Sequence, residues 1–208
     1  MIRIYGISRD QLLELPDLRE RIGAQWIDAW NKKHPSLEGD AARLSLGGLF
    51  LLQEAVGKGC LTYTPMGRPF FADSMQDFSI THTRDAVFCA VAPRGSSWHV
   101  GLDAEDLGRL PKERLESLSH RWFREEEQRI FEASPNEKTF LSIWTRKEAL
   151  VKRTGEGLRQ MAALDTYALC EAQKAAFWTY WQGDVCVTLC ANEGAMATER
   201  ILFYGAEE

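Results

Sequence analysis

The chain has 208 residues, of which 45% are hydrophobic and 26% charged, and its formal net charge is −5 at pH 7. This composition is typical of a soluble globular protein with room for one large domain or two small ones. The negative charge argues against nucleic acid as the main partner, because a nucleic-acid-binding face needs a clustered basic surplus. No stretch approaches the roughly 18 apolar residues of a membrane helix, so we expect no membrane partner.

The cysteines and the start of the chain indicate the compartment. Five cysteines, at positions 60, 89, 170, 186 and 190, form no CxxC pair, and such an odd set fits a reducing environment. The first residues alternate like a strand and lack the plan of a signal peptide. We therefore expect a cytoplasmic protein, with buried thiols at Cys186 and Cys190 in an apolar strand.

The first part of the chain predicts a strand, two helices and a hairpin. Residues 2–7 alternate as a strand. A helix is expected over about 17–30, and a second over about 40–56 is apolar nearly all round and therefore buried. The segments 78–83 and 86–92 are expected to pair as a hairpin.

Several basic residues in this part have two interpretations each. Arg43 lies in the first turn of the second helix, where a cation opposes the helix dipole. In a buried helix it indicates either a bound anion or a paired acid. Lys32, Lys33 and His34 form a basic turn, most simply a solvated loop. His82 ends the first strand of the hairpin, where a lone histidine is either structural or functional.

A Pro-Arg-Gly-Ser-Ser segment at 93–97 is the most linker-like part of the chain. It divides the sequence into an N-terminal half, 1–96, and a C-terminal half, 97–208. Each half is expected to begin with a short glycine-containing strand, followed by an amphipathic helix and a more buried one. We therefore predict an α+β fold of two similar α/β halves, related by a pseudo-two-fold axis, with an active-site cleft between them.

The C-terminal half predicts a charged helical region, a long helix and a set of strands. The charged region covers 111–132. Ser134 or Asn136 caps the long helix, which Gly155 and Gly157 end. Strands are expected near 175–181, 185–191 and 200–204.

Three carboxylates in this half stand out because of their spacing. Asp103 and Glu105 lie two apart in an expected strand, so their side chains leave it on the same face. Trp144, Glu148 and Lys152 lie at i, i+4 and i+8, on one stripe of the long helix. If helix and strand pack together, the three carboxylates converge. A hard cation would neutralise them, with Mg²⁺ as the first choice and Mn²⁺ as the second.

Four short motifs occur along the chain. They are Gly-Arg-Pro at 67–69, Phe-Ser-Ile-Thr-His-Thr at 78–83, Val-Gly-Leu-Asp-Ala-Glu at 100–105 and Trp-Thr-Arg-Lys-Glu-Ala-Leu-Val-Lys at 144–152. Together, in this order, they resemble the signature of the 4′-phosphopantetheinyl transferases. The length and the two-half layout resemble the surfactin-synthetase-activating type, a single-chain pseudo-dimer that acts as a monomer.

The resemblance implies an activity. This family moves the phosphopantetheine arm of coenzyme A to a serine of an acyl- or peptidyl-carrier protein and releases adenosine 3′,5′-bisphosphate. The resemblance implies a Mg²⁺ ion held by Asp103, Glu105 and Glu148, with Glu148 deprotonating the serine and Lys152 neutralising or protonating the leaving phosphate. Phosphoryl transfer needs positioning and charge neutralisation, which such a site supplies.

The resemblance also implies which residues hold coenzyme A. His82 would bind a phosphate, with Thr81 beside it, and Arg43, Arg68 and Lys147 would hold the nucleotide end. Arg68 stands where the family commonly has lysine; it keeps the charge but changes the geometry. A basic face for an acidic carrier is expected at Lys112, Arg114, Arg121 and Arg124.

The same residues fit other interpretations. A catalytically silent module would bind coenzyme A or a carrier without transfer. A metal-dependent hydrolase would cleave the coenzyme A pyrophosphate with water. Glu148 and Lys152 are also a favourable i, i+4 pair with no function, and Asp103 and Glu105 would equally well end a strand in solvent.

Overall fold

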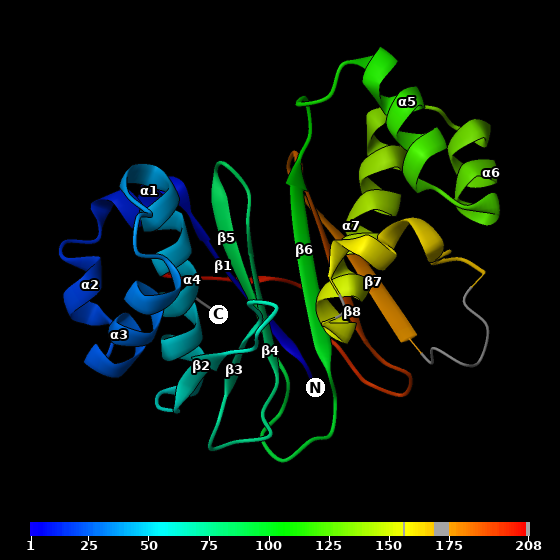
Figure 1. Cartoon of the computed structure of the whole chain (residues 1–208). Helices are drawn as coiled ribbons and strands as arrows, with labels where there is room; N and C mark the ends of the chain where they lie inside the picture. Colours follow the sequence, from blue (N-terminus) through cyan, green and yellow to red (C-terminus); the bar gives the residue numbers. More distant parts are fainter. Residues whose placement is uncertain (156, 169–174, 207–208) are drawn as a thin grey trace.

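The computed structural model describes residues 1–155, 157–168 and 175–206, so Cys170 lies outside the described residues. Figure 1 shows two lobes that meet along neighbouring strands. The N-terminal lobe contains β1 (Arg3–Ser8), α1 (Arg9–Glu14), α2 (Leu18–Arg21), α3 (Ala24–Lys33), α4 (Gly39–Val56), β2 (Leu61–Tyr63), β3 (Pro69–Phe71), β4 (Phe78–His82) and β5 (Ala86–Val91). The C-terminal lobe contains β6 (Val100–Asp106), α5 (Lys112–Trp122), α6 (Glu125–Ala133), α7 (Glu137–Thr154), the 3₁₀ helix η1 (Leu158–Ala163), β7 (Ala175–Gln182) and β8 (Val185–Asn192).

The strands form two larger sheets and one small ladder, so the expected α+β fold is confirmed. The N-terminal sheet has the order β4-β5-β1-β9, where β9 (Leu202–Phe203) comes from the end of the chain, and the C-terminal sheet has the order β6-β8-β7. The expected hairpin is β4–β5, which pairs antiparallel. β9 runs parallel to β1, so the tail of the chain returns to the N-terminal lobe.

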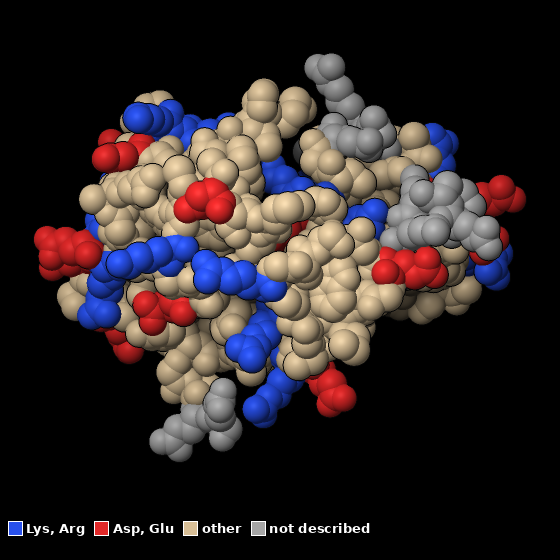
Figure 2. Space-filling view, turned by 90° about the horizontal axis from the view of Figure 1, so that it is seen from below, with Lys and Arg blue, Asp and Glu red and all other residues tan. Residues whose placement is uncertain are grey.

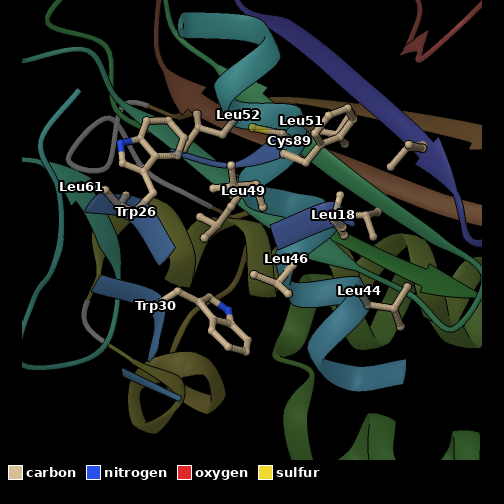
Figure 3. Packing of buried hydrophobic residues seen from close by; sticks show 14 of the residues in the cluster. Leu18, Trp26, Trp30, Leu44, Leu46, Leu49, Leu51, Leu52, Leu61 and Cys89 are labelled. Carbon is tan, nitrogen blue, oxygen red and sulfur yellow. The ribbon is translucent and has the colours of Figure 1, made fainter. Parts of the chain in front are cut away.

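The helix α4 is the centre of the N-terminal core, as its apolar surface predicts. Trp26 and Trp30 of α3 lie beside its leucines (Figure 3). The opposite side of α4 packs on β5 and β4. Gly47 and Gly48 allow close contact on both sides, because a Cβ at Gly47 would lie 2.7 Å from a methyl of Leu12 and one at Gly48 would overlap Ile80.

The single helix expected over 17–30 is wrong. Asp17 has a left-handed backbone, with φ of 44°, and Ile22 is extended, so the segment divides into α2 and α3. Gly23 then begins α3. The apolar residues of the expected stripe are buried all the same, because both short helices pack against the N-terminal core. The charged region 111–132 divides in the same way into α5 and α6, at the extended and buried Phe123.

The long helix α7 covers the C-terminal sheet (Figure 1). Asn136 caps its start by accepting a hydrogen bond from the backbone N–H of Thr139. Gly155 ends it with a left-handed backbone, at φ of 73°. α7 crosses β6 at Gly101, where a Cβ would overlap the carbonyl oxygen of Ala149 and the backbone nitrogen of Arg153. Only glycine lets helix and strand approach so closely.

The two lobes share a core and meet at β4 and β6. Ile4 and Phe88 of the N-terminal lobe pack in one cluster with Leu102 and Leu189 of the C-terminal lobe. Each lobe combines an eighteen-residue helix with a sheet that contains three antiparallel strands, which is compatible with the predicted pseudo-two-fold relation. That relation and the boundary at residues 96 and 97 stay predictions.

Side chains of the N-terminal lobe bind the backbone edge of β6. The carboxylate of Asp77 accepts a hydrogen bond from the backbone N–H of Val100 at 2.8 Å. The hydroxyl of Ser79 accepts one from the N–H of Leu102 at 2.9 Å. These bonds satisfy groups that a neighbouring backbone strand would otherwise satisfy. Among the described residues, no helix is both long enough and apolar enough to cross a membrane.

Candidate active site

A pocket of about 340 Å³ opens where the two lobes meet. Its walls come from the turn before β3, from β4 and from the C-terminal end of α7, and they are mostly apolar. Arg68, Glu148 and Lys152 line it beside Met66, Ile80 and Val151. In the view from below, Lys and Arg side chains form a band that runs across one lobe towards the middle of this face (Figure 2).

Asp103, Lys152 and Thr81 form a hydrogen-bonded cluster that joins the lobes at this pocket. The Lys152 Nζ lies 2.7 Å from the Asp103 Oδ1 and 3.1 Å from the Thr81 Oγ1. Asp103 is buried on β6, and its Oδ2 is also buried but has no hydrogen-bond partner among the described residues. A buried carboxylate oxygen without a donor is costly, and it marks a place for a proton or a cation.

The three expected carboxylates influence one another. Burial, with the charges of Asp103 and Glu105, raises the pKa of Glu148 to about 7, and the charge of Lys152 opposes this shift. Burial also raises the pKa of Asp103 and of Glu105, and the charge of Asp103 adds to the shift of Glu105. The three groups therefore share one electrostatic environment. They do not close around a point: among the described residues, no three His, Cys, Asp or Glu side chains are grouped closely enough to hold a metal ion.

His82 lies at the end of β4 and is largely exposed. Partial desolvation lowers the pKa of His82, and the nearby charge of Lys152 lowers it further, while the Thr83 backbone and Asp103 raise it. The opposing influences of Lys152 and Asp103 place the imidazole beside the hydrogen-bonded cluster. His82 is thus an accessible group at the site, and partial desolvation makes it harder to protonate because its pKa is lowered.

Comparisons with known proteins agree with this geometry. Residues 99–193 match the family model of the 4′-phosphopantetheinyl transferase superfamily, a segment that includes Asp103, Glu105, Glu148 and Lys152. The chain is 31% identical over 166 residues to the 4′-phosphopantetheinyl transferase HetI of Nostoc sp., a match that covers 73% of this chain and 67% of that protein. The chain belongs to the 4′-phosphopantetheinyl transferase superfamily. It is therefore a transferase.

Shorter matches extend to other members. The 4′-phosphopantetheinyl transferase AcpT of Salmonella typhi is 31% identical over 126 residues, which cover 58% of this chain and 63% of AcpT. The putative 4′-phosphopantetheinyl transferase slr0495 of Synechocystis sp. is 30% identical over 103 residues, which cover 47% of this chain and 40% of that protein. The alignments thus span from less than half to two thirds of these relatives' own lengths.

In this transferase Lys147 does not reach the pocket, contrary to its expected contact with the nucleotide. Its side chain is fully buried, and its Nζ lies 2.6 Å from the carboxylate of Glu127, which is equally buried. The carbonyl of Leu164 accepts a second hydrogen bond from the same Nζ. The physical reason is the helical turn of about 100° per residue, which directs Lys147 towards α6 when its neighbour Glu148 faces the pocket.

Arg43 is also placed away from the pocket. Its guanidinium donates a hydrogen bond to the carbonyl oxygen of Leu12, at 2.7 Å, and thereby joins α4 to α1. Arg43 forms no ion pair with an acidic side chain among the described residues, because a main-chain carbonyl at the end of α1 is the acceptor, and the bound anion stays a prediction. The dipole argument identified an unusual arginine but not the kind of acceptor.

Arg68 lines the pocket, yet its guanidinium is engaged by the protein. Both terminal nitrogens donate hydrogen bonds, to Asp77 and to main-chain carbonyls of the C-terminal lobe. Lys33 provides a different cation at the rim, since a Cβ on Gly67 would lie 2.7 Å from its Nζ. Lys33 is exposed and has no ion pair with the described residues.

The basic turn containing Lys33 is visible in the sequence, but its position beside Gly67 is not. Lys32 is exposed, and His34 packs between the rings of Trp30 and Tyr63. The sequence gives no signal for the roles of Asp77 and Ser79, because the backbone N–H groups that donate to them belong to the other lobe.

Proposed function

We propose that this transferase moves the 4′-phosphopantetheine arm of coenzyme A to a serine hydroxyl of an acyl- or peptidyl-carrier protein and releases adenosine 3′,5′-bisphosphate. The observation that carries the proposal is the pair of the buried Asp103 with the partly exposed Lys152, next to Glu148, at a pocket formed by both lobes. All three residues belong to the segment that matches the family model. The named activity of HetI and AcpT supports the same reaction.

The carboxylate oxygens of Asp103, Glu105 and Glu148 have the chemistry of divalent-cation ligands, and we propose that they draw together to hold Mg²⁺, with Mn²⁺ as an alternative. Three observations support this proposal: the donors are all oxygen, the Oδ2 of Asp103 has no partner among the described residues, and the negative charge of Asp103 raises the pKa of both Glu105 and Glu148. When bound, the ion would neutralise charge on the pyrophosphate of coenzyme A.

The protein's own groups suit the transfer step. Burial and the neighbouring carboxylates raise the pKa of Glu148 to about 7, which suits it to accept the proton of the attacking serine hydroxyl at neutral pH. The serine oxygen forms a bond to the phosphorus attached to pantetheine, and the bond to the bridging oxygen breaks with its electron pair on the leaving bisphosphate. Lys152 places a positive charge at this position, and the exposed His82 offers a hydrogen bond to a phosphate.

The nucleotide end of coenzyme A is assigned to a different cation from those expected. Lys33 is exposed at the pocket rim beside Gly67 and has no ion pair with the described residues, so it suits the 3′-phosphate. The apolar walls formed by Met66, Pro69 and Ile80 suit the adenine ring.

We further propose the pseudo-dimeric, surfactin-synthetase-activating type, acting as a monomer in the cytoplasm, with no nucleic-acid partner. The support is that both lobes of one chain line the pocket, so no second copy is needed to complete it. An acidic carrier would dock on the exposed basic residues of α5 and its end, Lys112, Arg114, Arg121 and Arg124.

A panel of apo-carrier proteins tests the function directly. The purified transferase is incubated with coenzyme A, Mg²⁺ and each carrier, and the carrier's mass and free adenosine 3′,5′-bisphosphate are both measured. We expect a mass gain of one phosphopantetheine group with an equal amount of bisphosphate. Coenzyme A binding without either product would indicate a silent module, and bisphosphate released without a carrier would indicate a hydrolase.

A further inference from the structure

Arg68 occupies a junction of four elements at the base of the pocket. It lies in the turn between β2 and β3, and its partners come from the start of β4, the start of β6 and the end of α7. The Nη2 lies 2.9 Å and 2.7 Å from the two carboxylate oxygens of Asp77 and 3.0 Å from the carbonyl oxygen of Val100. The Nη1 lies 3.0 Å from the carbonyl oxygen of Arg153.

Asp77 completes this junction from the other side. Its Oδ2 accepts a hydrogen bond from the backbone N–H of Val100 at 2.8 Å, in addition to the bond from Arg68. Both side chains are largely buried, with 21% of Arg68 and 12% of Asp77 exposed. A charge-assisted pair with little solvent contact is held more firmly than a surface ion pair.

The contact with α7 has a direct bearing on the active site. Arg153 contributes one of the last four carbonyl groups of α7, which as a class have no donor within the helix. A guanidinium at this end also complements the helix dipole. The same helix carries Glu148 and Lys152, so its position along its own axis sets where they meet Thr81 and Asp103.

We propose that Arg68 is a positioning residue which, with Asp77, clamps the end of α7 and the start of β6 to the N-terminal lobe, and that it does not bind coenzyme A. Asp77 already supplies the negative charge that a phosphate would supply. The pocket cation with no ion pair to the described residues is Lys33 instead.

The first arm of the test compares Arg68→Lys, Arg68→Met and Asp77→Asn. A clamp needs several donors in one plane, which lysine lacks. We therefore expect all three variants to lower the midpoint of thermal unfolding by roughly 5 °C or more. We expect kcat to fall about tenfold or more, with the KM for coenzyme A changed less than about threefold. The double variant Arg68→Met/Asp77→Asn should be no worse than the poorer single variant, because both remove the same junction.

Two control variants calibrate these effects. Lys33→Met should raise the KM for coenzyme A but not that for 3′-dephospho-coenzyme A, without altering the unfolding midpoint. Arg9→Met removes a more exposed arginine–aspartate pair, which joins α1 to α4 away from the pocket. It should change neither the unfolding midpoint nor the KM for coenzyme A.

A ligand role for Arg68 gives opposite results, which would overturn the proposal. Arg68→Lys would retain activity, Arg68→Met would raise the KM for coenzyme A far more than that for 3′-dephospho-coenzyme A, and Asp77→Asn would be harmless. Should Arg68→Met fail to fold, Asp77→Asn still separates the two roles, because it keeps the arginine.

The kinetic measurements rest on the proposed function. A wild-type chain without transfer would refute that function, whereas the unfolding midpoints would still decide whether Arg68 and Asp77 clamp the lobes.

Discussion

Neighbouring charged residues of this transferase have different roles: some face the pocket, and others stabilise the fold in buried ion pairs. Glu148 and Lys147 are neighbours on α7, yet one faces the pocket with a raised pKa and the other is fully buried against Glu127. The motif in the sequence identifies both residues but does not separate their roles. The separation depends on which side of the helix meets α6, and that is decided by tertiary packing.

The carboxylate of Glu148 provides the first prediction. A carboxyl group whose pKa is raised in the folded state destabilises the protein above its unfolded pKa, so Glu148→Gln removes a cost at pH 7. We expect the unfolding midpoint to stay the same or rise, while kcat falls about 10²- to 10⁴-fold. Calorimetry and the carrier mass assay measure the two quantities. A variant with lower stability and full activity would contradict the assigned role.

The pair of Lys147 and Glu127 provides the second. Lys147→Met leaves the Glu127 carboxylate buried with only its bonds to the Thr166 backbone and hydroxyl and to the Arg124 N–H. We expect a loss of about 3–5 kcal/mol in the free energy of unfolding, measured by denaturant titration. Arg129→Met removes an exposed pair with Glu126 and should cost no more than about 1 kcal/mol. Equal effects of the two variants would argue against a buried pair.

At the scale of elements, sequence periodicity predicts helices and strands that bury one face against the core. It does not predict where a helix ends when tertiary contacts decide the end. The hairpin β4–β5, the buried helix α4 and the capped helix α7 follow from alternation, apolar surface and cap residues. The break between α2 and α3 has no proline at that point and depends on an extended Ile22. A helical stripe persists across such a break, because both pieces bury the same face, so the pattern alone does not reveal it.

The crossing of α7 and β6 gives a prediction at this scale. Gly101→Ala would place a Cβ against the backbone of Ala149 and Arg153, so the helix that carries Glu148 must move. A displacement of about 1 Å can cost roughly a hundredfold in rate, and we expect a loss of at least that size together with a lower unfolding midpoint. Gly23→Ala is the matched control, because its Cβ would reach only the flexible end of Gln53, 3.4 Å away, and should leave kcat unchanged. Normal activity of Gly101→Ala would show that the crossing tolerates a shift.

At the scale of the whole molecule, the sequence predicts two halves but not how they are joined. The linker-like segment, the two eighteen-residue helices and the motifs indicate the layout and most of the site. The hydrogen bonds of the Asp77 and Ser79 side chains to the backbone of β6 give no periodic signal in the sequence, because each is a single polar contact and not part of a strand pairing. The return of β9 to β1 is likewise long-range, and a two-residue strand carries too little periodicity to assign its partner.

The shared core predicts how the molecule unfolds. Ile4 and Phe88 pack with Leu102 and Leu189, and the bonds of Arg68 and Asp77 to Val100 cross the same interface, so separating the lobes would expose buried residues of both. We expect one thermal transition, with equal calorimetric and van't Hoff enthalpies, measured by scanning calorimetry. Coenzyme A with Mg²⁺ should raise the midpoint as a single peak, because its proposed site is lined by both lobes. Two resolved transitions, or a ligand shift confined to one of them, would mean that the lobes fold independently and that the pocket belongs to only one.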